Sequence, residues 1–410
     1  MKQYVWYNAQ DSYFYENDFA YFDGLAVNAH LLAHNAKAFL ALALETAKPF
    51  FILPDIHFFQ FYSVEQFDNQ KGGIRISWEK LRANYPEIVT NILDARRSLV
   101  VADFASQVSI GEFARKILDY QRSALAAPYQ SLRRLLPIDS SVPRASFLVA
   151  PYFHFGSTND PWYRLAIEMC SAAVAAKGTD GVYGVILCSS GCLNLQDVAT
   201  ISRDFSGINL DGFLIWVDDF DEYIEQEDHL TAFVELVRRL SLTGRPVMNL
   251  YGTHFSVLLK HFGLDGLGSG ICVRDSMPAQ PPPPMGGPAG GPFPRYYVPK
   301  VYRKFAQEEA RRLTQLVPSL ACDCEICSTT QILNLPSQSF TDRASVRRLM
   351  RRHFLRIRSR EVNSVNSGTV TQSLSELSND AQLVAGTPTT VYDLLFLARW
   401  RRVLSSNTAI

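Results

Sequence analysis

The sequence predicts an α/β fold of the (β/α)8 TIM-barrel type, and two features before residue 280 predict it. The first is a series of short runs that are continuously apolar, as expected of parallel strands buried on both faces. The second is the amphipathic sequence between the runs, which predicts helices over residues 31–48, 162–177, 229–242 and 255–262. Such alternating units favour a closed parallel barrel, although a doubly wound open sheet has the same local pattern.

Eight apolar runs are the predicted strands of this barrel. They cover residues 24–29, 49–54, 98–102, 146–151, 182–188, 212–217, 246–251 and 266–273. In a parallel barrel the carboxyl ends of all strands meet at one end, where enzymes of this architecture hold their active sites. Polar residues directly after these runs are therefore the first candidates for function.

Composition places few limits on the function. The chain has 410 residues, and 47% of them are hydrophobic, which suffices for one large domain with an appendage. No apolar run reaches the length of a membrane span, and the first residues lack the pattern of a secretory signal. We therefore expect a cytoplasmic protein without membrane contact. With 40 basic and 40 acidic residues, nucleic-acid binding would need a local basic patch.

Beyond the predicted barrel the composition changes. Residues 279–294 (AQPPPPMGGPAGGPFP) contain too much proline and glycine for a helix or a strand and indicate a loop. We expect a barrel over 1–294, a small subdomain over 295–361 and a helical C-terminal extension over 362–410. In the last two we expect helices at 295–316, 342–361 and 391–404, and a loop or weak helix at 363–387.

A cysteine cluster in the small subdomain predicts a metal site. Cys322, Cys324 and Cys327 form a C-x-C-x-x-C turn, which brings three thiolates within reach of one ion. Zn²⁺ prefers four nitrogen or sulfur ligands in a tetrahedron, and His353, 26 residues after Cys327, is the expected fourth ligand. Four protein ligands leave no position for water, so this zinc would be structural. The alternative is three free thiols and a surface histidine.

The predicted helix over 342–361 is rich in arginine. Eight arginines and no acid lie between Arg343 and Arg360. Arginine suits phosphate because its planar fork donates two hydrogen bonds at once. The alternative is a solvated helix face whose arginines pair with acids from elsewhere in the chain. We expect the helix to bind the backbone of a nucleic acid through Arg347, Arg348, Arg351, Arg352 and Arg356.

Acidic residues follow three of the predicted strands. Asp55, Asp103 and Asp218 each come directly after an apolar run. Carboxylates at the carboxyl ends of barrel strands can serve as nucleophile or as general acid and base. We take Asp55 and Asp218 as candidate catalytic residues, and the alternative for each is a solvated loop carboxylate.

Together these motifs resemble the tRNA-guanine transglycosylase superfamily, most closely the branches that place deazaguanine bases in DNA. Members of that family are (β/α)8 barrels with a zinc subdomain, in which C-x-C-x-x-C is followed about one helix later by histidine. The match covers the order and the gap of the three cysteines and His353, and also the sequence Arg295-Tyr296-Tyr297. The resemblance implies exchange of guanine for a deazaguanine base through a covalent glycosyl-enzyme on an aspartate.

The resemblance also assigns roles at the predicted strand ends. The family motif Asp-Ser-Gly-Gly-aromatic-Gln is matched by Asp55 and Gln60, although His57 and Phe58 replace its glycines. The resemblance implies that Asp55 handles the proton of the incoming base. It also implies that Asp103 recognises the base, since a carboxylate accepts the N–H groups of a guanine-like edge.

The nucleophile of the family is missing at the matching position. The sequence GLDGLG, which ends at Gly268, resembles the family's Gly-hydrophobic-Asp-x-Phe-Asp segment, and Gly268 stands where the family has its nucleophilic aspartate. Asp218 is the expected substitute. Gly268 and Ser269 are then expected to line the substrate site together with Gln60 and Asp103.

Three functions remain open. The first is a zinc-containing enzyme that exchanges guanine for a deazaguanine base in DNA or tRNA. The second is a catalytically degenerate barrel of this type, a nucleic-acid-binding subunit of a modification or defence complex, which the glycine at 268 favours. The third is a hydrolase that removes a base without replacing it. All three have a nucleic acid as partner, and a protein partner or a second copy of the chain is a further candidate.

Overall fold

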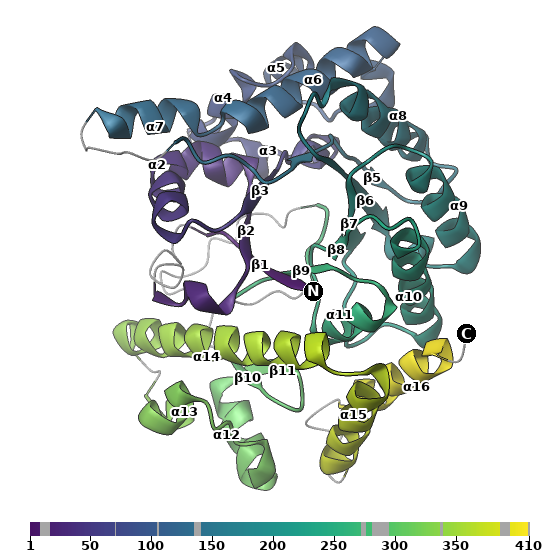
Figure 1. Cartoon of the computed structure of the whole chain (residues 1–410). Coiled ribbons are helices and arrows are strands. Elements are labelled where there is room, and N and C mark those ends of the chain that lie inside the picture. The colour runs from purple at the N-terminus through teal and green to yellow at the C-terminus, as the bar shows by residue number, and fades with distance from the viewer. Residues whose placement is uncertain are drawn as a thin grey trace.

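The computed structural model describes residues 1–8, 17–69, 71–104, 106–134, 141–271, 276–280, 295–336, 339–385 and 394–408. Its centre is a nearly closed barrel of parallel strands surrounded by helices (Figure 1). Going round the barrel, the strands pair in the order β3-β2-β1-β9-β8-β7-β6-β4. The Ser146 N–H donates to the Phe50 carbonyl at 2.8 Å and brings β4 beside β3. The predicted (β/α)8 fold is therefore confirmed.

The barrel strands are short and mostly buried. They are β1 (Lys2–Trp6), β2 (Gly24–Asn28), β3 (Phe50–Leu53), β4 (Leu148–Val149), β6 (Val182–Ser189), β7 (Gly212–Asp218), β8 (Val247–Asn249) and β9 (Gly266–Ser269). A further short strand, β5 (His154–Phe155), pairs with the end of β6. Every predicted strand except the one at 98–102 is present.

The strand predicted at 98–102 is wrong, and a strand that the apolar runs do not indicate takes its place. Only Leu99 of that segment is buried, and the Val100 side chain is 47% exposed, so the segment lies outside the sheet and leads into a 3-10 turn, η4 (Val101–Asp103). The remaining place in the barrel belongs to β1. Its sequence KQYVW begins with polar residues and has no apolar run, yet it pairs with both β2 and β9.

An outer layer of helices covers the barrel. The expected helices are confirmed as α2 (Ala29–Thr46), α8 (Pro161–Ala176), α10 (Glu227–Ser241), and α11 (His254–Leu258) with η6 (Leu259–Phe262), and α9 (Leu195–Ser206) joins them. Polar side chains fix where they begin. The Asp160 carboxylate, for example, accepts from the Trp162 N–H and so caps α8. Between β3 and β4 the chain forms α3 (Val64–Phe67), α4 (Ile76–Arg82), α5 (Glu87–Ala95), α6 (Gln107–Ser123) and α7 (Ala126–Arg133).

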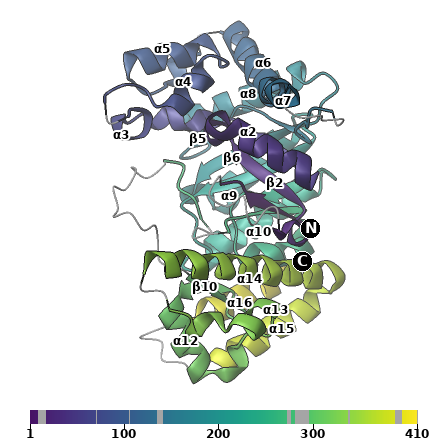
Figure 2. The same ribbon diagram turned by 90° about the vertical axis from the view of Figure 1, so that its left-hand side faces the viewer.

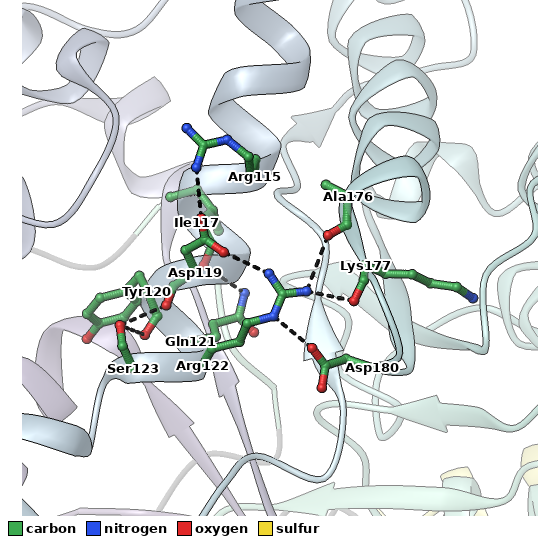
Figure 3. Close-up of polar contacts among 10 residues, drawn as sticks. All are labelled: Arg115, Ile117, Asp119, Tyr120, Gln121, Arg122, Ser123, Ala176, Lys177 and Asp180. Carbon is green, nitrogen blue, oxygen red and sulfur yellow. Dashed lines mark hydrogen bonds and ion pairs between the residues drawn. The ribbon is translucent and has the colours of Figure 1, made fainter.

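Side chains of α6 fasten this insertion to the barrel and to the end of α8, and Figure 3 shows the contacts of one of them, Arg122. The Gln121 side chain donates to the Val149 carbonyl and accepts from the Val149 N–H, both at 2.8 Å. It thereby satisfies the backbone of β4, which has only two residues. The Arg122 guanidinium donates to the Lys177 carbonyl just after α8 and to the Asp180 carboxylate. Gln121 thus joins α6 to β4, and Arg122 joins α6 to the segment that follows α8.

The interior of the barrel is filled with side chains. Trp216, Tyr152 and Leu187 belong to one buried cluster, and a second, larger cluster lies among the surrounding helices. Eight-stranded barrels are generally just wide enough for such filling. The barrel is therefore a packed core, and a functional site must lie at one of its ends.

Beyond the barrel lie a hairpin and a group of helices. The hairpin pairs β10 (Arg295–Val298) with β11 (Arg303–Ala306), and the helices are α12 (Gln307–Leu316), α13 (Glu325–Thr330), α14 (Phe340–Ser367), α15 (Val370–Val384) and α16 (Phe396–Thr408). The helix expected over 295–316 is thus wrong for its first half, where Tyr296, Tyr297 and Val298 form a buried strand. Residues 363–387, expected as a loop or weak helix, are largely helical in α14 and α15.

Helix α14 lies between the barrel and the other C-terminal elements in both views (Figures 1 and 2). It contacts β1, α11 and β10, and the Asn366 side chain donates to the Met1 carbonyl at 2.9 Å. Because α14 continues past residue 361, the expected domain boundary falls inside it. The proline- and glycine-rich residues 281–294 lie outside the described residues. Among the helices described, none combines the length and apolarity needed to cross a membrane.

Candidate metal centre and barrel mouth

The three cysteines and His353 come together in the small subdomain. Their ligand atoms, three Sγ and one ring nitrogen, all lie within 4.8 Å of one another. The cysteines lie before α13 and in its first turn, where the Cys324 sulfur accepts from the Cys327 N–H and caps the helix. Cys324 and His353 are fully buried. The four residues singled out by the sequence therefore form one group that could hold a metal ion.

His353 is held in position by the hairpin. Its Nε2 lies 2.7 Å from the Tyr297 carbonyl oxygen, and its ring stacks on Tyr296 with the centroids 4.4 Å apart. The carbonyl fixes the N–H on Nε2, so the lone pair of Nδ1 faces the Sγ atoms of Cys324 and Cys327, each at 3.3 Å. Sulfur and nitrogen ligands of a tetrahedral zinc lie roughly 3.5 Å apart. The donor set and its spacing fit a single ion with four protein ligands.

The barrel mouth, the end where the carboxyl termini of the strands meet, holds Asp55. This residue follows β3 in the left-handed backbone conformation, with φ of 56°, and it is completely buried. Its carboxylate accepts from Asn28 Nδ2 at 2.7 Å, from the His30 N–H at 2.9 Å and from His30 Nδ1 at 2.7 Å. Both carboxylate oxygens are therefore engaged by the end of β2 and the start of α2.

Asp218, the second candidate, ends β7. One of its oxygens lies 3.2 Å from His154 Nε2, and the other accepts from the Ala279 N–H at 2.5 Å. Burial alone would raise the pKa of Asp218, but the neighbouring His154 and the hydrogen bond from the Ala279 N–H outweigh burial and leave its pKa below the usual value. Asp218 is therefore ionised at neutral pH. Gln60 is linked to the same region, because its side-chain amide pairs with the backbone N–H and carbonyl of His154.

His57 lies in the aromatic packing of the mouth. Its ring centroid is 5.0 Å from that of Tyr152 and 4.8 Å from that of Trp216. Burial lowers the pKa of His57 well below its usual value, and the neighbouring His154 and His30 lower it further, so the ring is neutral. Neither ring nitrogen has a hydrogen-bond partner within the described chain. The histidine that replaces a family glycine thus fills space where a smaller residue would leave an opening.

Asp103 does not end a barrel strand. It closes the turn η4, and its carboxylate binds the Arg97 guanidinium, with oxygen-to-nitrogen distances of 2.6 and 2.8 Å, and the Val100 N–H. The side-chain hydrogen bond from Arg97 lowers the pKa of Asp103. The strand-end argument for Asp103 as a base-recognition residue is therefore lost, because the apolar run before it is not a strand.

Gly268 and Ser269 lie on β9, as the sequence predicts, and both are buried. A Cβ atom on Gly268 would lie 2.9 Å from the carbonyl carbon of Leu250 and closer still to its oxygen. Contacts of that kind with backbone essentially never occur, and Leu250, which follows β8, is held to the neighbouring strand β7 by a backbone hydrogen bond to Ile215. Position 268 therefore has no room for any side chain, including the aspartate that the resemblance places there.

The arginines of α14 meet acids that the sequence around them lacks. Arg352 Nε donates to the buried Asp18 at 2.9 Å, and Arg356 lies 3.7 Å from the same carboxylate and pairs with Glu325. Arg348 is exposed, whereas Arg347 and Arg351 are half-buried. The fold thus supplies counter-charges to Arg352 and Arg356, as the alternative interpretation of this helix expects.

No protein-family model matches the chain, and no curated protein matches it. Xylanases are among the solved structures with a detectable likeness. They include a GH10 endoxylanase retrieved from a sugarcane soil metagenome (11% identity, 62% of this chain and 67% of that chain, TM-score 0.32). A second is a psychrophilic glycoside hydrolase family 10 endo-β-1,4-xylanase, with 9% identity over 66% of this chain and 86% of that chain and a TM-score of 0.34. A third is an intracellular xylanase of Thermoanaerobacterium saccharolyticum, with 9% identity over 68% of this chain and 86% of that chain and a TM-score of 0.31.

Identities and TM-scores this low carry no argument about chemistry. The class of the protein follows from its own sheet topology and side chains. It is a (β/α)8-barrel protein with a C-terminal cysteine–histidine group that could hold a metal ion.

Sequence reasoning misses His30, the residue that contacts Asp55 twice. His30 lies in the first turn of α2, directly after a strand that the apolar pattern does predict. The rule that barrel sites lie at the carboxyl ends of strands could have indicated it. It has no motif of its own, and the 25 positions that separate it from Asp55 carry no sign of their contact.

Proposed function

We propose that this chain is a zinc-bearing barrel of the tRNA-guanine transglycosylase type that binds nucleic acid and has lost the exchange of bases. The observation that carries the loss is the backbone of Leu250, which occupies the space of any side chain at Gly268. The family resemblance requires a carboxylate there to attack the anomeric carbon, and glycine cannot do so.

Zinc is the metal that the cysteine–histidine group fits best. Three thiolates and one imidazole nitrogen form a soft donor set that suits a tetrahedral ion, and the Tyr297 carbonyl orients the imidazole as second-shell partners do in known zinc sites. The four positions are filled by protein, so the ion would hold α14 to the turn before α13. It would have no open position for water or substrate.

Nucleic-acid binding is supported by the arginines of α14 that face solvent. Arg348 is exposed, and the adjacent Arg347 and Arg343, about one turn earlier, are partly exposed. An arginine fork binds phosphate oxygens in pairs, so this end of the helix suits the backbone of DNA or tRNA rather than particular bases. Assembly with a protein partner or with a second copy of the chain belongs to the same proposal.

One experiment tests binding and exchange together. The purified protein is incubated with tRNA and with duplex DNA that carry labelled guanine, with and without a deazaguanine base, and binding is followed by fluorescence anisotropy. We expect salt-sensitive binding to at least one of them and no incorporation of the deazaguanine base. Incorporation would overturn the proposal.

Paired variants locate the binding surface. Replacing Arg347 and Arg348 by alanine should raise the Kd about tenfold and lower the slope of log K against log salt by roughly 2, since two phosphate contacts are lost. Arg164→Ala serves as the control, because that arginine is also exposed but lies on α8. Equal effects of the two changes would mean that α14 is not the binding surface.

A second candidate function keeps base exchange and uses Asp218 as the nucleophile. Its support is that Asp218 ends β7, is ionised and lies beside His154. A covalent nucleophile needs these properties. If this candidate holds, the incubation above gives incorporation in the wild type and none in Asp218→Asn.

A further inference from the structure

We infer that His30 is the acid–base group of the barrel mouth, that Asp55 orients it, and that its reaction is hydrolysis of an N-glycosidic bond in a nucleic acid. The substrate class rests on the nucleic-acid binding proposed above. The role of His30 rests on its own contacts. A carboxylate that holds a histidine in one tautomer is a common arrangement in proteins.

The geometry around His30 fixes its ring. Nδ1 lies 2.7 Å from Asp55 Oδ2, so the proton of the neutral ring is on Nδ1 and the lone pair is on Nε2. The ring stacks on Trp78 at a centroid distance of 5.3 Å and meets the edge of Phe58 at 5.7 Å. Nε2 accepts no hydrogen bond from the described residues. One ring nitrogen is therefore anchored and the other is available to a ligand.

Asp55 is poorly placed to react itself. Its side chain is 0% exposed and both oxygens already accept hydrogen bonds, whereas the His30 side chain is 25% exposed. A proton arriving from a ligand in the mouth would meet His30 first. This changes the role that the family resemblance gives to Asp55, from a group that handles the proton to a positioning residue behind it.

The missing nucleophile selects the reaction. Position 268 has no room for a nucleophilic side chain, and the Asp218 carboxylate is already engaged by His154 and the Ala279 N–H, so we assign the attack to water. In this step His30 Nε2 takes a proton from water, and the water oxygen forms a bond to the anomeric carbon. The bond from that carbon to the base nitrogen breaks, and the base leaves with the electron pair and takes up a proton from solvent. The products are a free base and an abasic sugar.

A second histidine pair provides the main competing assignment. His154 also has a carboxylate partner, but Nε2 of its ring is the atom that faces Asp218, and its backbone is held by Gln60. Its side chain is 18% exposed, less than that of His30. We therefore assign the acid–base role to His30 and use His154 as a comparison in the test.

The test measures abasic sites and binding separately. End-labelled single-stranded DNA, duplex DNA and tRNA are incubated with the full chain. Abasic sites are detected by strand cleavage with alkali for DNA and with aniline for tRNA, and binding is measured by anisotropy. We expect His30→Asn to lower the rate at least about 100-fold with the Kd unchanged, because a general base contributes about that much or more. Added imidazole should restore part of the rate.

Matched variants separate the catalytic from the structural effect. His34→Asn, an exposed histidine one turn further along α2, should leave the rate and its pH profile unchanged. Asp55→Asn should change the shape of the pH–rate profile while circular dichroism shows a folded protein, which a purely structural role would not produce. If Asp55→Asn does not fold, the rate of His30→Asn and its rescue by added imidazole still test the role of His30.

Two results overturn this inference. One is a wild-type protein that binds nucleic acid and forms no abasic sites, an outcome that leaves the proposed binding function intact. The other is a rate that survives in His30→Asn and is lost in His154→Asn. A protein that binds none of the three nucleic acids would instead overturn the proposed function.

Discussion

The cysteine–histidine group and the barrel mouth are both assembled from distant parts of the chain, but they differ in where their polar atoms point. In the cysteine–histidine group four ligand atoms converge within 4.8 Å on a common centre. In the barrel mouth each carboxylate is directed at a neighbouring residue, Asp55 at His30 and Asp218 at His154. The first arrangement specifies a ligand almost completely, whereas the second specifies pairs of residues that can act on several kinds of ligand.

The two regions are also expected to differ in how much their stability depends on a bound ligand. Thiolates held together without a cation repel one another, so the cysteine–histidine group is expected to need its ion for stability. The pairs in the mouth satisfy themselves, so the mouth is expected to be stable without a ligand. Three changes test this contrast, and the expected effects on the free energy of unfolding decrease from the first to the third.

Removal of one metal ligand should have the largest effect. We expect Cys324→Ala to lower the free energy of unfolding by roughly 5 kcal/mol or more, because binding of a structural zinc contributes directly to folding. Urea unfolding with and without a chelator, together with metal analysis, measures it. Cys170→Ala is the control, since Cys170 is equally buried but lies in α8 outside the group, and it should cost only about 1 kcal/mol. Equal losses in the two variants, or no bound metal, would contradict a metal centre.

Restoring the family aspartate should have the next largest effect. We expect Gly268→Asp to lower the free energy of unfolding by about 3 kcal/mol, because its Cβ would overlap the backbone of Leu250. Gly111→Asp is the control: it lies in α6 with open space around the Cβ position, and its effect should stay within about 0.5 kcal/mol. A Gly268→Asp protein that is as stable as the wild type and exchanges bases would remove the argument that Gly268 accounts for the loss of base exchange.

The smallest effect concerns Asp218 and depends on pH. Its pKa is lowered in the folded protein, so its stabilisation is complete above the unfolded value of about 3.9 and is lost as the pH falls through the folded value. We expect Asp218→Asn to cost about 1 kcal/mol at pH 7 and progressively less below pH ~4. Urea unfolding of both proteins across this range measures the difference. A gap that widens in acid would mean that His154 and Ala279 do not stabilise the ionised form.

The grouping of the three cysteines and His353 could be predicted because the cysteines are close together in the sequence, although the histidine lies 26 residues further on. Three cysteines within six positions indicate a metal site, and a histidine lies on the arginine-rich helix that follows them. What could not be predicted is how His353 is held. Its anchor is the Tyr297 carbonyl, which lies in β10, within the segment 295–316 that the sequence predicts to be a helix.

The barrel was also predictable in class but not in every strand. Continuous apolar runs find strands buried on both faces, which describes β6 and β7 well. They fail for β1, which begins with polar residues, and for 98–102, whose valines lie at the surface of an insertion. The mouth was least predictable, since the partners of Asp55 and Asp218 are chosen by the fold and leave no spacing in the sequence.

The position of β1 has a consequence for how the chain is made. Lys2 pairs with Gly266, so the first strand leaves the ribosome long before its second neighbour exists. At 5–20 residues per second, the wait is on the order of ten seconds or more. During that time one side of β1 is an open edge that other nascent chains could join. The risk of aggregation through β1 is therefore greatest during synthesis, before β9 pairs with β1 and closes the barrel.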